Sequence, residues 1–234
     1  MRRSIIKARV NSRLNMESIN VFIKNLSHQR YPHVFNPWLD TDTTWDISSN
    51  AAKVRQDRLR LHLDNPMAKY CLIGEAPGYQ GCRMSGCAFT SERLIYEGAI
   101  PRLERYSRER MSTRGKPFTE PSATVVWNAV QELGIAKEII LWNAFAWHPM
   151  GDRALSNRTP DNKEFKAGLP ILEEFLSLIA SINKNIMLIA VGQNAKTTLS
   201  RLGVSLDGSL RHPAYGGARE FRRGLHDCIV SECE

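Results

Sequence analysis

The chain has 234 residues, of which 42% are hydrophobic and 24% charged, and its formal net charge is +8. This length supports a sizeable core, and no apolar run reaches the ~20 residues of a membrane-spanning helix, so we expect no membrane association. Residues 1–13 are basic and no long apolar stretch follows them, so we expect no secretory signal and a cytoplasmic protein. The basic balance favours a polyanionic partner such as nucleic acid.

Residues 1–66 predict a mostly helical N-terminal extension. Helical stretches are expected at 16–26 and 51–63, and Pro66 closes the second region because proline disfavours helix at the residue before it. Between them, "FNPWLDTDTTWD" (35–46) either packs on the sheet or contacts nucleic acid. We expect the extension to pack on the remaining chain, so that residues 1–234 form a single domain.

From residue 69 onward, apolar strands alternate with helices. Ser122 is the expected N-cap of the first helix after residue 66, and Gly168 with Pro170 is expected to break a later one. Nearly all-apolar strands separated by helices are typical of a parallel sheet covered on both faces. The predicted fold class is therefore α/β, a three-layer αβα sandwich with a central, mainly parallel four-stranded sheet. The expected strands are 69–74, 138–145, 186–192 and 208–213, and the expected helices are 122–134, 161–165, 170–182 and 194–203.

Polar side chains follow three of the predicted strands. Glu75 comes directly after the first strand, Asn143 lies at the end of the second and His212 at the end of the fourth. Ligands of open parallel sheets bind beyond the carboxyl ends of the strands, so these three residues are expected at one edge of the sheet. The turn "GEAPGYQG" (74–81) keeps most of its side chains small, as a turn does where another group approaches the backbone closely.

Other patterns do not predict a site by themselves. "VGQNAKTT" (191–198) lacks the glycines of a phosphate-binding loop, because Ala190 and Ala195 stand at those positions. The two basic clusters, at 102–116 and 219–223, either form a solvated surface or bind phosphate. We interpret the cysteines as buried thiols and expect no metal, since structural zinc sites favour tighter spacing. The five cysteines are Cys71, Cys82, Cys87, Cys228 and Cys233.

Three segments together resemble the uracil-DNA glycosylase superfamily. They are "GEAPGYQGCRMSGCAFTSE" (74–92), "LWNAFAWHP" (141–149) and "RHPAYGG" (211–217), and the resemblance runs in order from about Tyr70 to Leu225. The first segment resembles the superfamily's first motif in its "GEAPG" form. His212 and Pro213 resemble its second motif, in which Ala214 replaces the usual serine. Ala76 stands where several branches have an aspartate.

The resemblance implies a role for each matched residue. Glu75 and His212 are the expected catalytic residues, with Glu75 orienting a water and His212 donating to O2 of the departing base. Asn143 is expected to read the base and Phe89 to stack on it, and the segment 212–224 is expected to enter the DNA minor groove as a loop. Further base-binding residues are expected at Ala76, Tyr79 and Gly74, and DNA-binding residues at Pro77, Gly78, Pro213, Tyr215, Arg219, Arg222 and Arg223.

The implied function is that of a monofunctional DNA glycosylase, a hydrolase that flips out uracil and leaves an abasic site in base excision repair. The alternatives are a glycosylase for another deaminated or mismatched base (hypoxanthine, xanthine or thymine in G·T), or a lesion-binding protein with weak catalysis. The expected partner is uracil-containing DNA, single- or double-stranded, bound by a monomer that associates with the bacterial nucleoid. We expect no cofactor, because Trp147 stands where the "GEAPG" branch has an iron–sulfur cysteine.

Overall fold

The computed structural model describes residues 2–230, with side chains from residue 15 onward. The helices of the described chain are α1 (Arg2–His28), α2 (Ala51–Leu63), α3 (Cys82–Ser85), α4 (Glu92–Tyr96), the 3₁₀ turn η1 (Glu104–Tyr106), α5 (Pro121–Glu132), α6 (Asn162–Ile182), α7 (Gln193–Arg201) and α8 (Ala218–Val230). The strands are β1 (Val34–Phe35), β2 (Tyr70–Gly74), β3 (Ile139–Asn143), β4 (His148–Pro149), β5 (Met187–Val191) and β6 (Gly208–Leu210).

Four strands form the central sheet, in the order β3-β2-β5-β6. Each neighbouring pair is parallel. The register pairs Gly74 with Asn143, so β2 and β3 end side by side. The predicted α/β class with a four-stranded parallel sheet is therefore confirmed. The expected strands are correct in number and order, and β6 is shorter than expected.

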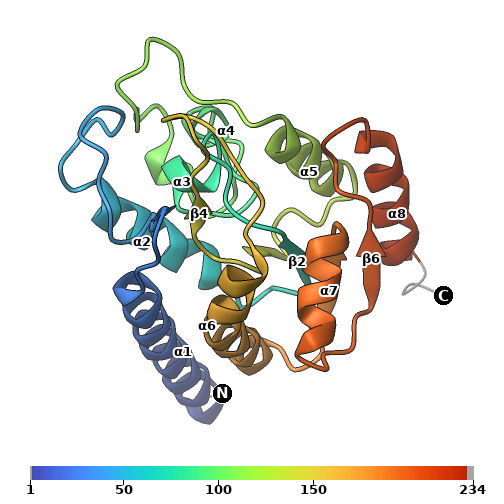
Figure 1. Cartoon of the computed structure of the whole chain (residues 1–234). Coiled ribbons are helices and arrows are strands. Elements are labelled where there is room, and N and C mark those ends of the chain that lie inside the picture. The colour runs from blue at the N-terminus through green and yellow to red at the C-terminus, as the bar shows by residue number, and fades with distance from the viewer. Residues whose placement is uncertain (1, 231–234) are drawn as a thin grey trace.

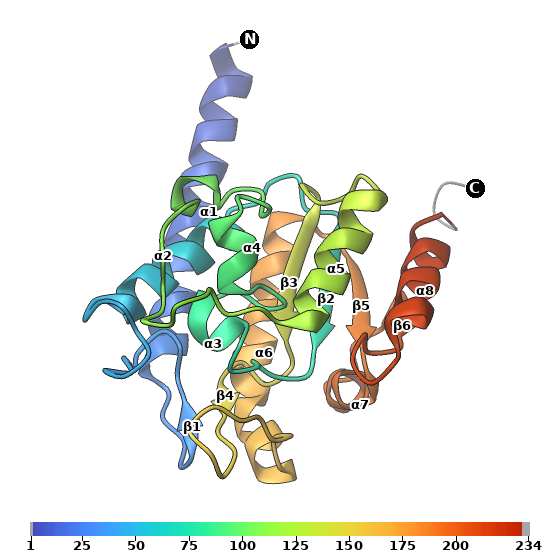
Figure 2. The same cartoon turned by 90° about the horizontal axis from the view of Figure 1, so that it is seen from above.

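Helices cover both faces of this sheet (Figures 1 and 2). Side chains alternate along each strand, so Cys71 and Ile73 of β2 belong to the core beneath α1, α2, α6 and α7. Leu72 of β2 and Leu141 of β3 belong to the opposite core, beneath α4, α5 and α8. The three-layer arrangement follows because strands that are apolar on both faces remove their surface from water only when both faces are covered.

The segment 35–46 packs on the fold through a stack of aromatic rings. Trp142 of β3 lies between Trp38, at a centroid distance of 5.8 Å, and Phe175 of α6, at 4.6 Å. Trp38 is 1% exposed, and its indole N–H donates to the Gly86 carbonyl at 3.1 Å. Of the two expectations for this segment, packing on the sheet is the one that the structure shows.

The edge of the sheet at β3 is closed by side chains. The Leu141 N–H donates to Nε2 of the buried His62 at 2.9 Å, and Asn65 and Arg102 both donate to the Ile139 carbonyl. Burial, with a smaller contribution from Arg102, lowers the pKa of His62 to about 3, so its ring is neutral and can accept this bond. These contacts satisfy backbone groups that an open strand edge would leave unpaired.

Three local expectations were wrong, each for a physical reason. α6 continues through Pro170, because buried residues before and after the proline pack on the same core and hold the helix together. Ser122 is not the N-cap of α5: Pro121 takes the first helical position, for which its ring presets φ, and Glu120 becomes the cap residue. Residues 218–230, partly expected as a loop, form α8, whose buried residues recur every four positions at Phe221, Leu225 and Ile229.

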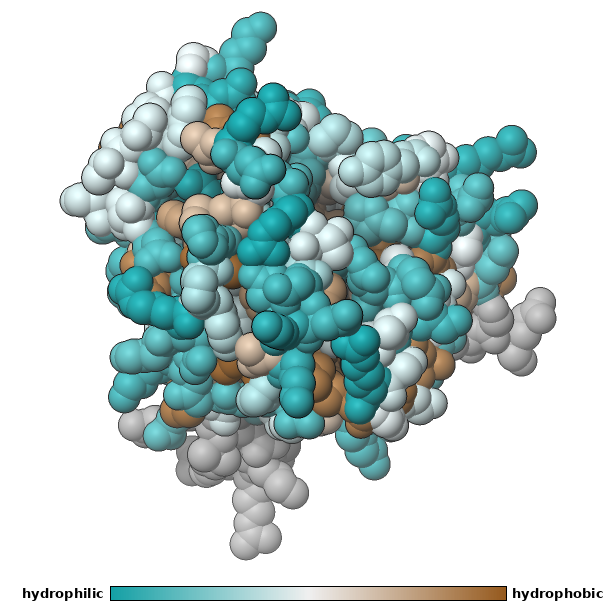
Figure 3. All heavy atoms as spheres, viewed as in Figure 1, coloured by the Kyte–Doolittle hydropathy of each residue, from teal (hydrophilic) through white to brown (hydrophobic). Residues whose placement is uncertain are grey.

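The face shown in Figure 3 is mostly hydrophilic, and its hydrophobic side chains form small scattered patches. In the part of the chain that the structure describes, no helix has both the length and the apolar character needed to cross a membrane.

Buried Glu92, at the start of α4, holds the segment 110–118 in place through hydrogen bonds and an ion pair. Its carboxylate accepts hydrogen bonds from Met111 N, Phe118 N, and both the backbone N–H and the hydroxyl of Ser112, and it pairs with Arg110 Nε at 2.9 Å. Burial alone would raise the pKa of Glu92, but these hydrogen bonds outweigh it and lower the pKa below its ordinary value.

We expect Glu92→Ala to lower the free energy of unfolding by about 2–4 kcal/mol at pH 7, because it leaves several buried donors without an acceptor. A group with a lowered pKa stabilises the fold above its unfolded pKa, so the difference between variant and wild type shrinks as the pH falls below about 4.5. Urea unfolding at pH 7 and at pH 4 measures both effects. Glu97→Ala, at the exposed C-cap of α4, is the control, and an equal loss in both variants contradicts the assignment.

Candidate active site

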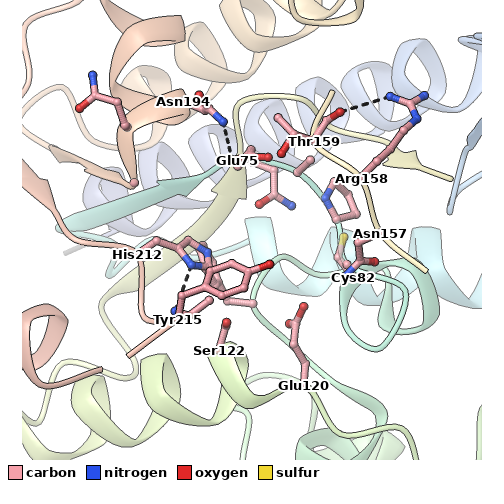
Figure 4. A pocket seen from close by; sticks show the side chains of 18 of the residues that line it. Glu75, Cys82, Glu120, Ser122, Asn157, Arg158, Thr159, Asn194, His212 and Tyr215 are labelled. Carbon is pink, nitrogen blue, oxygen red and sulfur yellow. Dashed lines mark hydrogen bonds between the residues drawn. The ribbon is translucent and has the colours of Figure 1, made fainter. Parts of the chain in front are cut away.

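A cavity of about 440 Å³ opens at the carboxyl ends of the central strands (Figure 4). Glu75 after β2, Asn143 at the end of β3 and His212 after β6 all line it. Gln193 and Asn194, at the start of α7, complete this side. The structure therefore brings the three polar strand-end residues together in one cavity, as the parallel strand order implies.

Gly74 allows an aromatic ring and an amide to meet at the base of the cavity. A Cβ on Gly74 would lie 2.4 Å from Phe89 Cζ and 3.0 Å from Asn143 Oδ1, so a side chain here would displace one or both. Phe89 is buried and has a φ of +48°, a conformation that costs a non-glycine residue about 1–3 kcal/mol. The surrounding packing holds Phe89 in this conformation, with its ring facing the cavity.

Asn143 is buried, with only 5% of the residue exposed. Among the hydrogen bonds of the described residues, none involves its amide group. Burying an amide without partners is costly, so this group is available to a ligand that offers one donor and one acceptor.

A backbone hydrogen bond determines which ring nitrogen of His212 carries the proton. The Ala214 N–H donates to His212 Nδ1 at 3.2 Å, so the neutral ring carries its proton on Nε2. Burial lowers the pKa of His212, and Arg211 lowers it further, while the Glu75 carboxylate opposes them. The ring is thus a neutral donor near pH 7. Its centroid lies 6.1 Å from that of Phe89.

Asn194 fixes the carboxylate of Glu75. Its Nδ2 donates to Glu75 Oε2 at 2.7 Å, and Figure 4 shows the two side chains meeting at the side of the cavity away from Glu120. The other carboxylate oxygen has no protein partner among the described residues. It can accept from a water or face a positive charge. Ala76, beside it, lines the cavity with a methyl group and supplies no second carboxylate.

Glu120 is a cavity residue that the sequence did not identify. Its carboxylate rests against two glycines: a Cβ on Gly78 would lie 2.5 Å from Oε1, and one on Gly81 would lie 2.2 Å from Oε2. No described residue makes a hydrogen bond or ion pair with this carboxylate. Burial raises the pKa of Glu120 to about 7. Nothing in the sequence distinguishes this glutamate from the others, since it lies in an irregular segment before Pro121.

Two contacts fix the turn that follows β2. His148 Nδ1 donates to the Pro77 carbonyl at 2.8 Å, and the Tyr79 N–H donates to Asn157 Oδ1 at 2.8 Å. Burial lowers the pKa of His148 to about 4, although the bond to Pro77 opposes this, so the ring stays neutral. His148 and Asn157 were also missed, because they act on the backbone of the turn rather than through a motif.

The remaining expected residues lie at or beyond the rim. Tyr215 is 98% exposed, has a φ of +52° and stands at the mouth of the cavity, while Pro213 behind it is buried. Tyr79 is not a lining residue, and its ring meets Phe118 edge-on at a centroid distance of 6.3 Å. The expected loop arginines are instead exposed on the helix α8; they are Arg219, Arg222 and Arg223.

Within the described part of the chain, no three His, Cys, Asp or Glu side chains gather in a way that would hold a metal ion. Cys71, Cys82 and Cys87 are buried free thiols, and Cys228 is half-buried. Burial raises the pKa of Cys87 to about 12 and that of Cys82 well above its ordinary value. Cys233 lies outside the described residues.

Comparisons with known proteins identify the family and agree with the fold. A family model described as the uracil DNA glycosylase superfamily matches residues 61–230. Among solved structures, the wild-type SMUG2 of Pedobacter heparinus is similar, with a TM-score of 0.61 and 17% sequence identity over 93% of this chain and 97% of that chain. At this identity the likeness shows the fold. A search of curated proteins gave no match.

The environment of Glu120 predicts a pH-dependent stability. A carboxyl whose pKa is raised binds more protons in the folded state, so its contribution falls as the pH rises from about 4.5 to about 7. We expect Glu120→Gln to raise the free energy of unfolding by about 1–3 kcal/mol at pH 8 and by much less at pH 5. Urea unfolding at both pH values measures this difference. Equal effects at pH 5 and pH 8 would refute it.

Proposed function

The chain belongs to the uracil-DNA glycosylase superfamily, and from this membership we propose that it is a monofunctional DNA glycosylase that hydrolyses the N-glycosidic bond of uracil in DNA. The observation that carries the proposal is the cavity itself. An unengaged amide, an aromatic ring and a neutral imidazole donor line one space at the end of the sheet. A base inside a duplex cannot reach such a cavity, so the nucleotide leaves the stack and enters it.

Recognition of uracil rests on Asn143 and Phe89. The Asn143 amide accepts from uracil N3–H and donates to O4, and cytosine offers the reverse pattern. A buried amide that is left unpaired by the wrong base gives strong discrimination. The Phe89 ring stacks on the base, a contact worth ~1–3 kcal/mol in single-strand binders.

Cleavage breaks the bond between C1′ and N1, and the bonding electrons leave with the base. Negative charge collects on O2, where the Nε2–H of His212 donates to it, and positive charge develops on the sugar. Glu75 faces this charge and orients a water. The water oxygen bonds to C1′, and the proton it releases passes to solvent through the carboxylate. Ala76 offers no carboxylate beside it, and we assign this role to Glu75.

DNA binding is assigned to the mouth of the cavity and to α8. The fully exposed Tyr215 enters the gap that the extruded nucleotide leaves, and the exposed arginines of α8 contact the backbone phosphates. Pro77 and Gly78 bring the main chain of the turn close to the extruded nucleotide. We further propose that the protein acts as a monomer, in the cytoplasm and on the nucleoid.

We expect the wild-type protein to convert a uracil-containing oligonucleotide into an alkali-labile product. His212→Ala is expected to lower the single-turnover rate by about 10²–10³-fold, as loss of an oxyanion donor does. Asn143→Ala is expected to lower it by about 10²-fold through two lost hydrogen bonds. A gel assay after alkaline cleavage measures these rates on single- and double-stranded DNA.

His28→Ala and Asn185→Ala, at exposed positions that do not line the cavity, are the matched controls. Full activity in both cavity variants would remove the site assignment. Tight binding of uracil-containing DNA without any cleavage by the wild type would favour a lesion-binding protein, for which Ala76 is the relevant departure.

We expect the affinity for DNA to fall steeply with salt, because neutralised phosphates release counterions. Each of Arg219→Ala, Arg222→Ala and Arg223→Ala should reduce the slope of log K against log salt by about 0.9. Lys184 is exposed and precedes β5, at the amino ends of the strands and away from the cavity. Lys184→Ala should therefore leave the slope unchanged. Fluorescence anisotropy over a salt series provides the measurement. A flat dependence for the wild type would refute the role of α8.

A further inference from the structure

The backbone between α3 and Phe89 is irregular and entirely buried. All residues from 81 to 90 are buried, and α3 ends at Ser85, four residues before Phe89. Phe89 itself has a φ of +48°, a conformation that a residue with a side chain keeps only where its surroundings impose it. A buried segment outside helices and strands also needs other partners for its carbonyl groups. The groups that supply them therefore bear on the ring that faces the cavity.

Side chains hold five consecutive carbonyl groups of this segment, those of residues 84–88. The last two accept from the segment itself. Ser85 Oγ donates to the Cys87 carbonyl at 3.0 Å, and Thr90 Oγ1 donates to the Ala88 carbonyl at 2.9 Å.

The first three carbonyls accept from the N-terminal extension. Arg58 Nη1 donates to the Ser85 carbonyl at 2.7 Å and to the Met84 carbonyl at 3.3 Å. The indole N–H of Trp38 donates to the Gly86 carbonyl at 3.1 Å. Two side chains that are distant in the sequence thus fix the path of the backbone on its way to Phe89.

Arg58 is a cation that a purely structural contact would not need. The residue is 4% exposed, its Nε has no hydrogen-bond partner, and no acidic side chain among the described residues forms an ion pair with it. Burial lowers its pKa to about 10, so the guanidinium is still charged at neutral pH. A buried charge without a counter-ion is costly, and apolar side chains often replace such groups without loss of stability. What the guanidinium supplies here is the fixed position of two carbonyls.

The helix α2 carries Arg58 and also holds Trp38. Gln56 Nε2 donates to the Trp38 carbonyl at 2.7 Å, and α2 lies beside α3 (Figures 1 and 2). Gly86, with a φ of +81°, rests on the backbone of α2, because a Cβ there would lie 2.8 Å from the Arg55 carbonyl oxygen. The extension therefore provides both the donors and the surface against which this turn packs.

We propose that Trp38 and Arg58 are positioning residues for the reaction: they hold the carbonyls before Phe89 and so keep its ring in the orientation that stacks on an extruded base. The inference rests on the proposed function, which assigns the stacking to Phe89, and it gives the N-terminal extension a part in base binding. Neither side chain lines the cavity, so each acts through Phe89. A ring that leaves this orientation stabilises the extruded base less, so a smaller share of the bound DNA is ready to react.

The test measures the maximal single-turnover rate on a uracil-containing duplex and the affinity for the same duplex with an abasic site. Trp38→Phe keeps an aromatic ring beside Trp142 and removes the indole N–H. We expect it to lower the rate about 3–10-fold, the effect of one hydrogen bond, and Phe89→Ala to lower it about 5–100-fold. The affinity for the abasic duplex should not change, because that DNA has no base on which Phe89 could stack.

A double-mutant cycle separates positioning from general destabilisation. If Trp38 acts through Phe89, Trp38→Phe should not lower the rate further in the Phe89→Ala background. Arg58→Met should lower the rate of the wild-type background, and Arg58→Lys, which keeps a charged donor, should recover part of the loss. Trp147→Phe is the matched control, because it removes the same volume and an equally buried indole N–H, which donates to the Leu26 carbonyl at 3.2 Å.

Thermal melts verify that each variant is folded, and the two Arg58 variants decide the matter if Trp38→Phe is not. A folded Trp38→Phe with the wild-type rate overturns the inference. An equal loss in Trp147→Phe, or a full additional loss in the Phe89→Ala background, also overturns it, and the proposed function stays intact in each case. A wild type that does not cleave uracil-containing DNA refutes the proposed function, and the inference falls with it.

Discussion

The parallel pairing of β2 with β3 fixes the geometry on which the cavity depends. The register places Gly74 opposite Asn143, so the turn after β2 begins beside the Asn143 side chain. β5 and β6 run in the same direction, so α7 and the segment after β6 deliver Asn194 and His212 to the same edge. Polar groups from four distant parts of the chain thus share one space, and no described residue makes a hydrogen bond with the Asn143 amide or with Nε2 of His212.

Close contacts with the backbone explain why the turn at 74–81 contains glycines at positions 74, 78 and 81. At Gly74 the Phe89 ring and the Asn143 amide occupy the space that a side chain would need. At Gly78 and Gly81 the Glu120 carboxyl group occupies it. The sequence alone indicated that something approaches this backbone. In the structure the approaching groups are side chains of the protein itself, which line the cavity and leave its centre open to a ligand.

The fold and the strand-end residues could be predicted because both follow from short-range patterns. Apolar strands separated by helices specify a covered parallel sheet, and the rule for strand ends then places Glu75, Asn143 and His212 together. The segment around Pro170 was misread, because tertiary packing on the core outweighs the local cost of a proline. Glu120 and Asn157 lie in irregular segments without a period or motif, so only tertiary structure shows where they point.

The support of the cavity extends into the N-terminal extension. Phe35 of β1 pairs with His148 of β4, the residue that donates to the Pro77 carbonyl, and Trp38 stacks on Trp142, the residue before Asn143. Phe35 and Trp38 both lie outside the stretch that matches the family model, which starts at residue 61. A protein shortened to that boundary would keep every residue that lines the cavity, but it would lose the contacts of Phe35 and Trp38 that pack behind His148 and Trp142.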